Sequence, residues 1–172
     1  TTKMLMAQQV DLLRRRLPEG SLMIAKKVWD PFVRVFHWSL VVLFTANAVV
    51  LDDDTKMHQW VGYAILGLVV ARIVWGFIGT KYARFSSFPP SIRASVDQLT
   101  DIVTGRRQAH IGHTPLGGLM IFNLLATLLV IGLSGYLMTT DTFWGVEWPE
   151  ELHEAAVTWA EVSILLHIGA VI

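Results

Sequence analysis

The sequence predicts an all-α membrane protein, folded as a bundle of four transmembrane helices. Its 172 residues have a mean hydropathy of +0.48; 53% of them are hydrophobic and only 16% are charged. A run of about 20 apolar residues is long enough to cross a bilayer as a helix. A chain of this length holds at most four such runs, and the capping and turn residues between the runs indicate where each helix ends.

The first two transmembrane helices are expected at about residues 31–51 and 57–78. Asp30-Pro31 has the pattern of a helix N-cap followed by proline in the first turn. The polar segment 52–55 ends the first helix and supplies an N-cap for the second.

The last two transmembrane helices are expected at about residues 115–138 and 150–172. Thr114-Pro115 repeats the pattern of cap and proline, and the apolar run that follows it carries no charged residue. Pro149, followed by two glutamates, is typical of a first helical turn and indicates where the fourth helix begins.

A shorter amphipathic helix is expected at about residues 91–104, between the second and third transmembrane helices. Its apolar residues recur at positions i, i+4, i+7 and i+11, and a glycine follows them: Ile92, Val96, Leu99, Val103 and Gly105. The segment is too short and too charged to cross a bilayer. We therefore expect it to lie in the membrane interface.

The distribution of charge predicts the orientation of the bundle. The chain up to Arg34 carries seven Lys and Arg residues and the connector 79–113 carries five, whereas the two opposite connectors carry only Lys56. Because basic residues favour the cytoplasmic side, both termini are expected to be cytoplasmic. Residues 1–28 contain no apolar stretch of signal-peptide length, so they are expected to form a cytoplasmic leader to a membrane domain of residues 29–172.

The two opposite connectors, on the outer side, are acidic. Their carboxylates are those of Asp52, Asp53, Asp54, Asp141, Glu147, Glu150 and Glu151. Such residues either dock a basic partner, steer a cation, or form the solvated acidic side of a protein whose basic residues lie inside. The sequence leaves these alternatives open.

Four histidines fall at two depths of the predicted bundle. His37 lies near the cytoplasmic start of the first helix, and His58 lies at the outer start of the second. His153 and His167 are fourteen residues apart in the fourth helix, which is nearly four turns and about 21 Å, so both side chains leave the same face. Depth therefore pairs His58 with His153 on the outer side and His37 with His167 on the inner side.

Each of these pairs has the composition of a haem ligand set. Two imidazoles from facing helices are what a six-coordinate haem iron accepts, whereas a bare metal ion needs three or four clustered ligands. Small residues about one turn from the histidines would leave room for a flat macrocycle: Gly62, Ala156 and Ala170. The alternative is that the histidines are structural, but two depth-matched pairs favour two haem sites.

The composition excludes several other classes of site. The chain has no cysteine, which excludes disulfides, cysteine-ligated iron–sulfur clusters and covalent attachment of haem. Its formal net charge is zero, so bulk charge gives no indication of nucleic-acid binding. No residue pattern typical of a catalytic triad or a phosphate-binding loop is found, and no catalytic residue is predicted.

Arg72 is expected to lie deep in the second helix, fourteen residues after His58 and on the same face. A buried arginine in a membrane needs an anion, and we expect a propionate of the inner haem to supply it. The alternative is that the side chain extends to the cytoplasmic interface.

Several segments resemble one family of bacterial membrane cytochromes, the cytochrome b561 and nickel–iron hydrogenase b-type cytochrome family. They are residues 28–38 (VWDPFVRVFHW), 61–63 (VGY), 72–79 (RIVWGFIG), 82–85 (YARF) and 112–118 (GHTPLGG), the last with Thr114 where the family more often has Asn. The resemblance covers about residues 28–172. It implies a four-helix fold with two b haems and with iron ligands on the first, second and fourth helices.

The resemblance also implies a function in the bacterial inner membrane, as part of a respiratory chain. We expect electron transfer between a periplasmic cytochrome or redox enzyme subunit and the membrane quinone pool, with quinone as a candidate second cofactor. The alternative is a stand-alone superoxide:quinone oxidoreductase, which would make the chain an enzyme. The acidic outer side disfavours that alternative, because an anionic substrate needs positive potential there.

Overall fold

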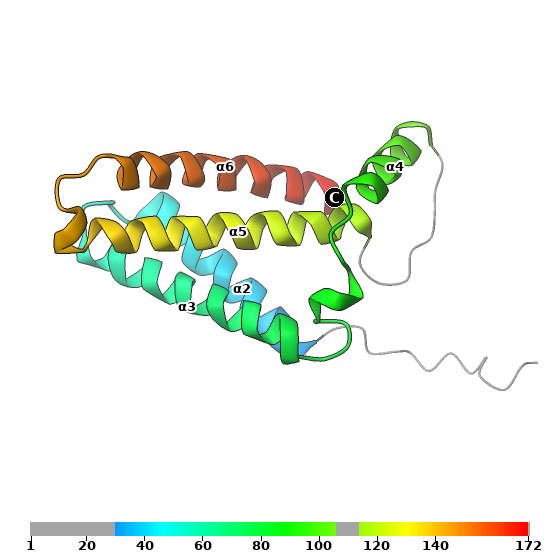
Figure 1. Ribbon diagram of the computed structural model, residues 1–172, viewed down its shortest axis with the longest axis horizontal. Helices are drawn as coiled ribbons and strands as arrows, with labels where there is room; N and C mark the ends of the chain where they lie inside the picture. Colours follow the sequence, from blue (N-terminus) through cyan, green and yellow to red (C-terminus); the bar gives the residue numbers. More distant parts are fainter. Residues whose placement is uncertain (1–29, 106–113, 172) are drawn as a thin grey trace, which may run out of the picture.

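The computed structural model describes residues 30–105 and 114–171, and within them it is all-helical and contains no strand (Figure 1). The long helices are α2 (Pro31–Thr45), α3 (Lys56–Ile78), α5 (Pro115–Met138) and α6 (Trp148–Val171), and α4 (Ile92–Val103) is shorter. Short turns of helix, η1 (Ala46–Val50), η2 (Phe85–Ser87) and η3 (Asp141–Phe143), lie between them. The expected leader, residues 1–28, lies outside the described residues.

The long helices run side by side as an antiparallel bundle (Figure 1). α6 packs along α5, α5 packs along α3, and α3 packs along α2. The short connectors α2–α3 and α5–α6 lie at one end of the bundle (Figure 1). The start of α2, the end of α3, the start of α5 and the end of α6 lie at the other (Figure 1). The helix α4 packs against α5 at that second end.

Three of the helical segments described here are long and apolar enough to cross a membrane, namely Pro31–Val50, Lys56–Ile78 and Pro115–Met138. The helix α6 has the same 24-residue length as α5 but is not among them. Its four glutamates and two histidines lower its hydropathy. Length and hydropathy alone therefore support three of the four expected transmembrane helices.

The end of the first span differs from a regular α-helix. The α-helix stops at Thr45, and residues Ala46–Val50 form a π-helical turn. The sequence predicts one continuous helix here because apolar periodicity does not distinguish a π-turn from an α-turn. Such turns frequently occur at functional sites.

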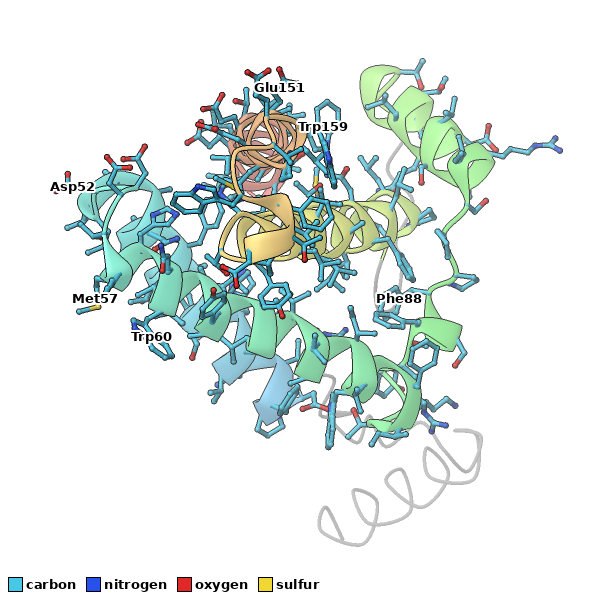
Figure 2. The ribbon with its side chains drawn as sticks, turned by 60° about the vertical axis from the view of Figure 1, so that its left-hand side comes forward. Asp52, Met57, Trp60, Phe88, Glu151 and Trp159 are labelled. Atoms are coloured by element: carbon cyan, nitrogen blue, oxygen red, sulfur yellow. The ribbon has the colours of Figure 1, made fainter. Side chains whose placement is uncertain are left out.

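Many large apolar side chains are exposed on the surface of the bundle. The buried core is small and consists of Phe36, Ile65, Val69, Leu125 and Leu128. By contrast, Val49 is 78% exposed, and Met57 and Trp60 point away from the helices (Figure 2). A surface of this kind is expected where the solvent is lipid, because hydrocarbon chains cover it at no hydrophobic cost.

Two glycines allow neighbouring groups to approach the helix backbones. A Cβ atom added at Gly132 of α5 would lie 2.8 Å from Cδ1 of Leu66 in α3. A Cβ atom added at Gly76 of α3 would overlap the ring of Phe85, from the connector that follows α3. Small residues are typical of close helix packing in membranes, where packing replaces the hydrophobic driving force.

The carboxylate of Asp30 joins three parts of the chain at the start of α2. Its Oδ1 accepts hydrogen bonds from the backbone N–H of Phe32 (2.8 Å) and Val33 (3.4 Å), which is the expected N-cap. Its Oδ2 accepts hydrogen bonds from Trp75 Nε1 (3.1 Å), near the end of α3, and from Thr80 Oγ1 (2.6 Å). Burial raises the pKa of Asp30, but these hydrogen bonds together outweigh it, so the pKa lies below its usual value.

Replacing Asp30 by Ala should destabilise the bundle by about 0.5–2 kcal/mol from the lost cap alone. Because the pKa of Asp30 is lower in the folded state, its stabilisation is complete above the unfolded pKa and is lost as the pH falls through the folded pKa. The free energy of unfolding in detergent should therefore fall less between neutral pH and about pH 3 for Asp30→Asn than for the wild type. The exposed Asp54→Asn is the matched control, and equal pH profiles for both variants would contradict the assignment.

Candidate functional site

The structure brings the four predicted histidines together in two pairs. The ring centroids of His37 (α2) and His167 (α6) lie 6.4 Å apart. Those of His58 (α3) and His153 (α6) also lie 6.4 Å apart. We call His58 and His153 the outer pair and His37 and His167 the inner pair. Since α6 supplies one member of each, the pairs are separated along it by fourteen residues, about 21 Å.

Hydrogen bonds to α5 hold the imidazole of His153. Its Nδ1 lies 3.0 Å from the carbonyl oxygen of Ile131 and 3.2 Å from Oγ of Ser134. A carbonyl oxygen can only accept, so Nδ1 carries the proton and Nε2 keeps a free lone pair. This arrangement is typical of metal-ligating histidines, whose second nitrogen usually donates to a fixed acceptor.

His58 has a different environment, which includes the π-helical turn. Its Nε2 lies 3.5 Å from Nδ2 of Asn47, the second residue of that turn. Its Nδ1 and the Oδ1 atom of Asn47 are buried and have no hydrogen-bond partner among the described residues. Asn47 was not predictable from the sequence as part of the site, because only the tertiary structure places the end of the first span beside His58.

The sequence model of the family described as prokaryotic cytochrome b561 matches residues 28–172. The chain belongs to this family. It is therefore related to membrane-bound b-type cytochromes whose function is electron transfer. No curated protein and no solved structure gives a significant match to the chain.

The spacing of the histidine pairs in this cytochrome b561 protein fits a b-type haem. Imidazole nitrogens bind metal ions at about 2.0–2.1 Å and lie about 1.1 Å from the ring centroid, so two imidazoles that held one iron between them would have centroids about 6.2–6.4 Å apart. Both pairs have this separation. Among residues 30–105 and 114–171, no cluster of three or more metal-ligating side chains is present. A pair is sufficient for haem because the macrocycle supplies the other four ligands.

The packing of the helices also leaves space beside the histidines. In the part of the chain that the structure describes, α6 packs closely along α5 but not along α2 or α3. A Cβ atom added at Gly62, one turn after His58, would have no neighbour within 4 Å. Ala170 is exposed, whereas Ala156 is buried by protein atoms and adds no open space.

Arg72 is buried near the inner end of α3, with only 4% of its surface exposed. Its Nη2 donates a hydrogen bond to the carbonyl oxygen of Ala83 (3.2 Å), and its Cζ lies 5.1 Å from the centroid of the Phe85 ring. Its Nη1 is buried and has no partner within the described ranges. These contacts tie Arg72 to the connector after α3 and leave one guanidinium nitrogen available for an acceptor.

A second polar contact between α5 and α6 was not predicted. Asn123 donates from Nδ2 to Oγ of Ser163 (2.9 Å) and accepts at Oδ1 from Nε1 of Trp159 (3.0 Å). Ser163 is one turn before His167, so this contact positions the part of α6 that carries the inner-pair histidine. Asn123 lies in an uncharged apolar run, and nothing in the sequence indicates which helix it faces.

Replacing Asn123 by Leu should weaken the α5–α6 interface by about 1 kcal/mol, since each interhelical hydrogen bond in a membrane contributes roughly 0.6 kcal/mol. A double-mutant cycle of Asn123→Leu with Ser163→Ala, measured by unfolding in detergent, isolates the Asn123–Ser163 hydrogen bond and should give a coupling energy of roughly 0.6 kcal/mol. Thr158→Val is the control, because the Thr158 hydroxyl donates only within α6, to the carbonyl of Glu154. A coupling energy of zero would contradict the contact.

Proposed function

We propose that this cytochrome b561 protein moves electrons across the bacterial inner membrane, between a periplasmic redox partner and the membrane quinone pool. In this proposal it holds two b haems, one with the outer pair and one with the inner pair. The observation that supports it best is the identical 6.4 Å separation of the two pairs, which matches axial ligation of iron. When bound, a haem supplies an iron that gains and loses one electron reversibly.

In this proposal α6 is the fourth transmembrane helix, because it carries a histidine of each pair and lies along α5, a candidate span. Both termini and the α3–α5 connector are cytoplasmic in this proposal, because the excess of basic residues in these segments favours the cytoplasmic side. The helix α4 lies in the interface, since Ile92, Val96 and Leu99 form an exposed apolar face on it.

Arg72 is the proposed partner of the inner haem. A buried cation in a membrane requires an anion, and Nη1 of Arg72 is buried without an acceptor. A propionate of the inner haem would satisfy it and would receive a charge-assisted hydrogen bond. The same guanidinium also fixes the Ala83 carbonyl, so it joins this site to the cytoplasmic connector.

The acidic outer end favours a basic redox partner over a small anionic substrate. The loop residue Asp52 and Glu151 of α6 extend from this end of the bundle (Figure 2), and the neighbouring carboxylates are exposed as well. Negative potential repels superoxide and attracts a basic protein surface. A co-purifying periplasmic subunit supports the proposal, whereas turnover of the isolated chain with superoxide and quinone would favour the alternative oxidoreductase.

Single substitution of each of the four histidines by Ala should reduce the haem content from two per chain to about one. Each change removes one of the two imidazoles that would hold the iron at one site and leaves the other pair intact. Pyridine haemochrome analysis of the purified protein measures this ratio. A wild-type ratio of one or zero, or a ratio of two in any of the four variants, would contradict the proposed ligands.

Replacing Arg72 by Leu should lower the potential of the inner haem or the retention of that haem. A nearby cation stabilises the reduced form of the haem, which carries less positive charge at the iron. Redox titration followed by absorbance measures both effects. Arg72→Lys keeps the charge and should have a smaller effect on the potential, while unchanged spectra and potentials in Arg72→Leu would refute the propionate contact.

A further inference from the structure

The α5 backbone is accessible to His153 because of a glycine. Ile131 is four residues before Gly135, so its carbonyl oxygen also accepts the regular helical hydrogen bond from the Gly135 N–H. A Cβ atom added at Gly135 would lie 3.1 Å from Cε1 and 3.3 Å from Nδ1 of His153. These contacts are tighter than ordinary van der Waals contact, so a Cβ atom at position 135 would require the imidazole to shift by a few tenths of an ångström. Such a shift would disturb the 3.0 Å contact of Nδ1 with the Ile131 carbonyl.

Ser134 provides a second acceptor for the same Nδ1 proton. Its hydroxyl donates back to the helix, to the carbonyl of Val130 at 2.8 Å and that of Ile131 at 3.1 Å. Its single hydrogen is used there, so the Oγ lone pairs remain to accept from His153 Nδ1 at 3.2 Å. Ser134 is 1% exposed, which removes water as a competing partner.

The two imidazoles of the outer pair thus differ in their hydrogen bonding. His153 Nδ1 has two fixed acceptors, whereas His58 Nδ1 is buried without one among the described residues. When the Nδ1–H group donates a hydrogen bond to a fixed acceptor, the imidazole becomes a more basic ligand through Nε2, and its orientation is fixed. A more basic ligand stabilises ferric over ferrous iron and so lowers the reduction potential.

We infer that Gly135 and Ser134 are positioning residues for the outer haem. Together they orient His153 with Nε2 toward the iron, strengthen its bond to the iron and lower the potential of the outer haem relative to that of a haem with unassisted ligands. This inference rests on the proposed function, because it requires a haem at the outer pair.

The test uses the purified haem-loaded protein and the variants Gly135→Ala and Ser134→Ala. Gly135→Ala should raise the outer haem's midpoint potential and weaken haem binding there by about 10–100-fold, the usual effect of losing such a partner. Ser134→Ala removes one of two acceptors without adding bulk, so it should raise the potential by less. The inner haem should be unchanged in both variants.

Redox titration monitored by absorbance and low-temperature electron paramagnetic resonance measures the two potentials and the ligand geometry. Transfer of haem to an acceptor protein measures retention. The spectra of His153→Ala and His167→Ala assign the signals to the outer and the inner haem. Gly67→Ala is the matched control, because a Cβ atom there has no neighbour within 4 Å. Position 67 is two and a half turns after His58, on the opposite face of α3.

Two results would overturn the inference. Both variants could leave the outer potential and its resonance signal unchanged, or Gly135→Ala could shift both haems equally while Gly67→Ala shifts neither. These results are distinct from failure of the proposed function. That failure would appear in the wild type, as fewer than two haems per chain, or as two haems retained in His153→Ala.

Discussion

The packing of α6 against α5 is the interaction on which both histidine pairs depend. The helix α6 carries one histidine of each pair, yet α5 is the helix along which it packs closely in the described structure. Small buried residues allow the two helices to approach, and Ala160 has no exposed surface at all. Polar contacts then fix the rotation of α6 at two levels, through Asn123 near the inner pair and through Ile131 and Ser134 at the outer pair.

This arrangement separates the closely packed side of α6, which faces α5, from the more open side that faces α2 and α3; His153 contacts both sides, because its Nδ1 bonds to α5. One side of α6 is used for contact with α5, and the histidines meet α2 and α3 without close packing of those helices against α6. In a membrane, such separation has an energetic reason. Lipid provides no hydrophobic force to close the bundle, so small residues and hydrogen bonds must define the interface that holds the open side in place.

The sequence predicted the features that depend on local chemistry or on simple periodicity. Asp30, Thr55 and Thr114 cap the helices that follow them, as their positions indicated. The histidines meet in the expected pairs because helix direction and depth follow from the order of the spans, although their role as iron ligands stays a prediction. Features that depend on tertiary contacts were not predictable, among them the bonds of Asp30 to Trp75 and Thr80 and the acceptors of His153. The π-helical turn was not predictable either, because its apolar pattern is the same as that of an α-helix.

The Asp30 contacts have a consequence for biosynthesis. They link residue 30 to residues 75 and 80, so the hairpin of α2 and α3 can close while the ribosome is still translating α5. By contrast, neither histidine pair exists until α6 has been made, because its residues complete both. A closed α2–α3 hairpin is therefore compatible with a partly translated chain, whereas a cofactor that requires both members of a histidine pair would bind only after the last helix has been translated.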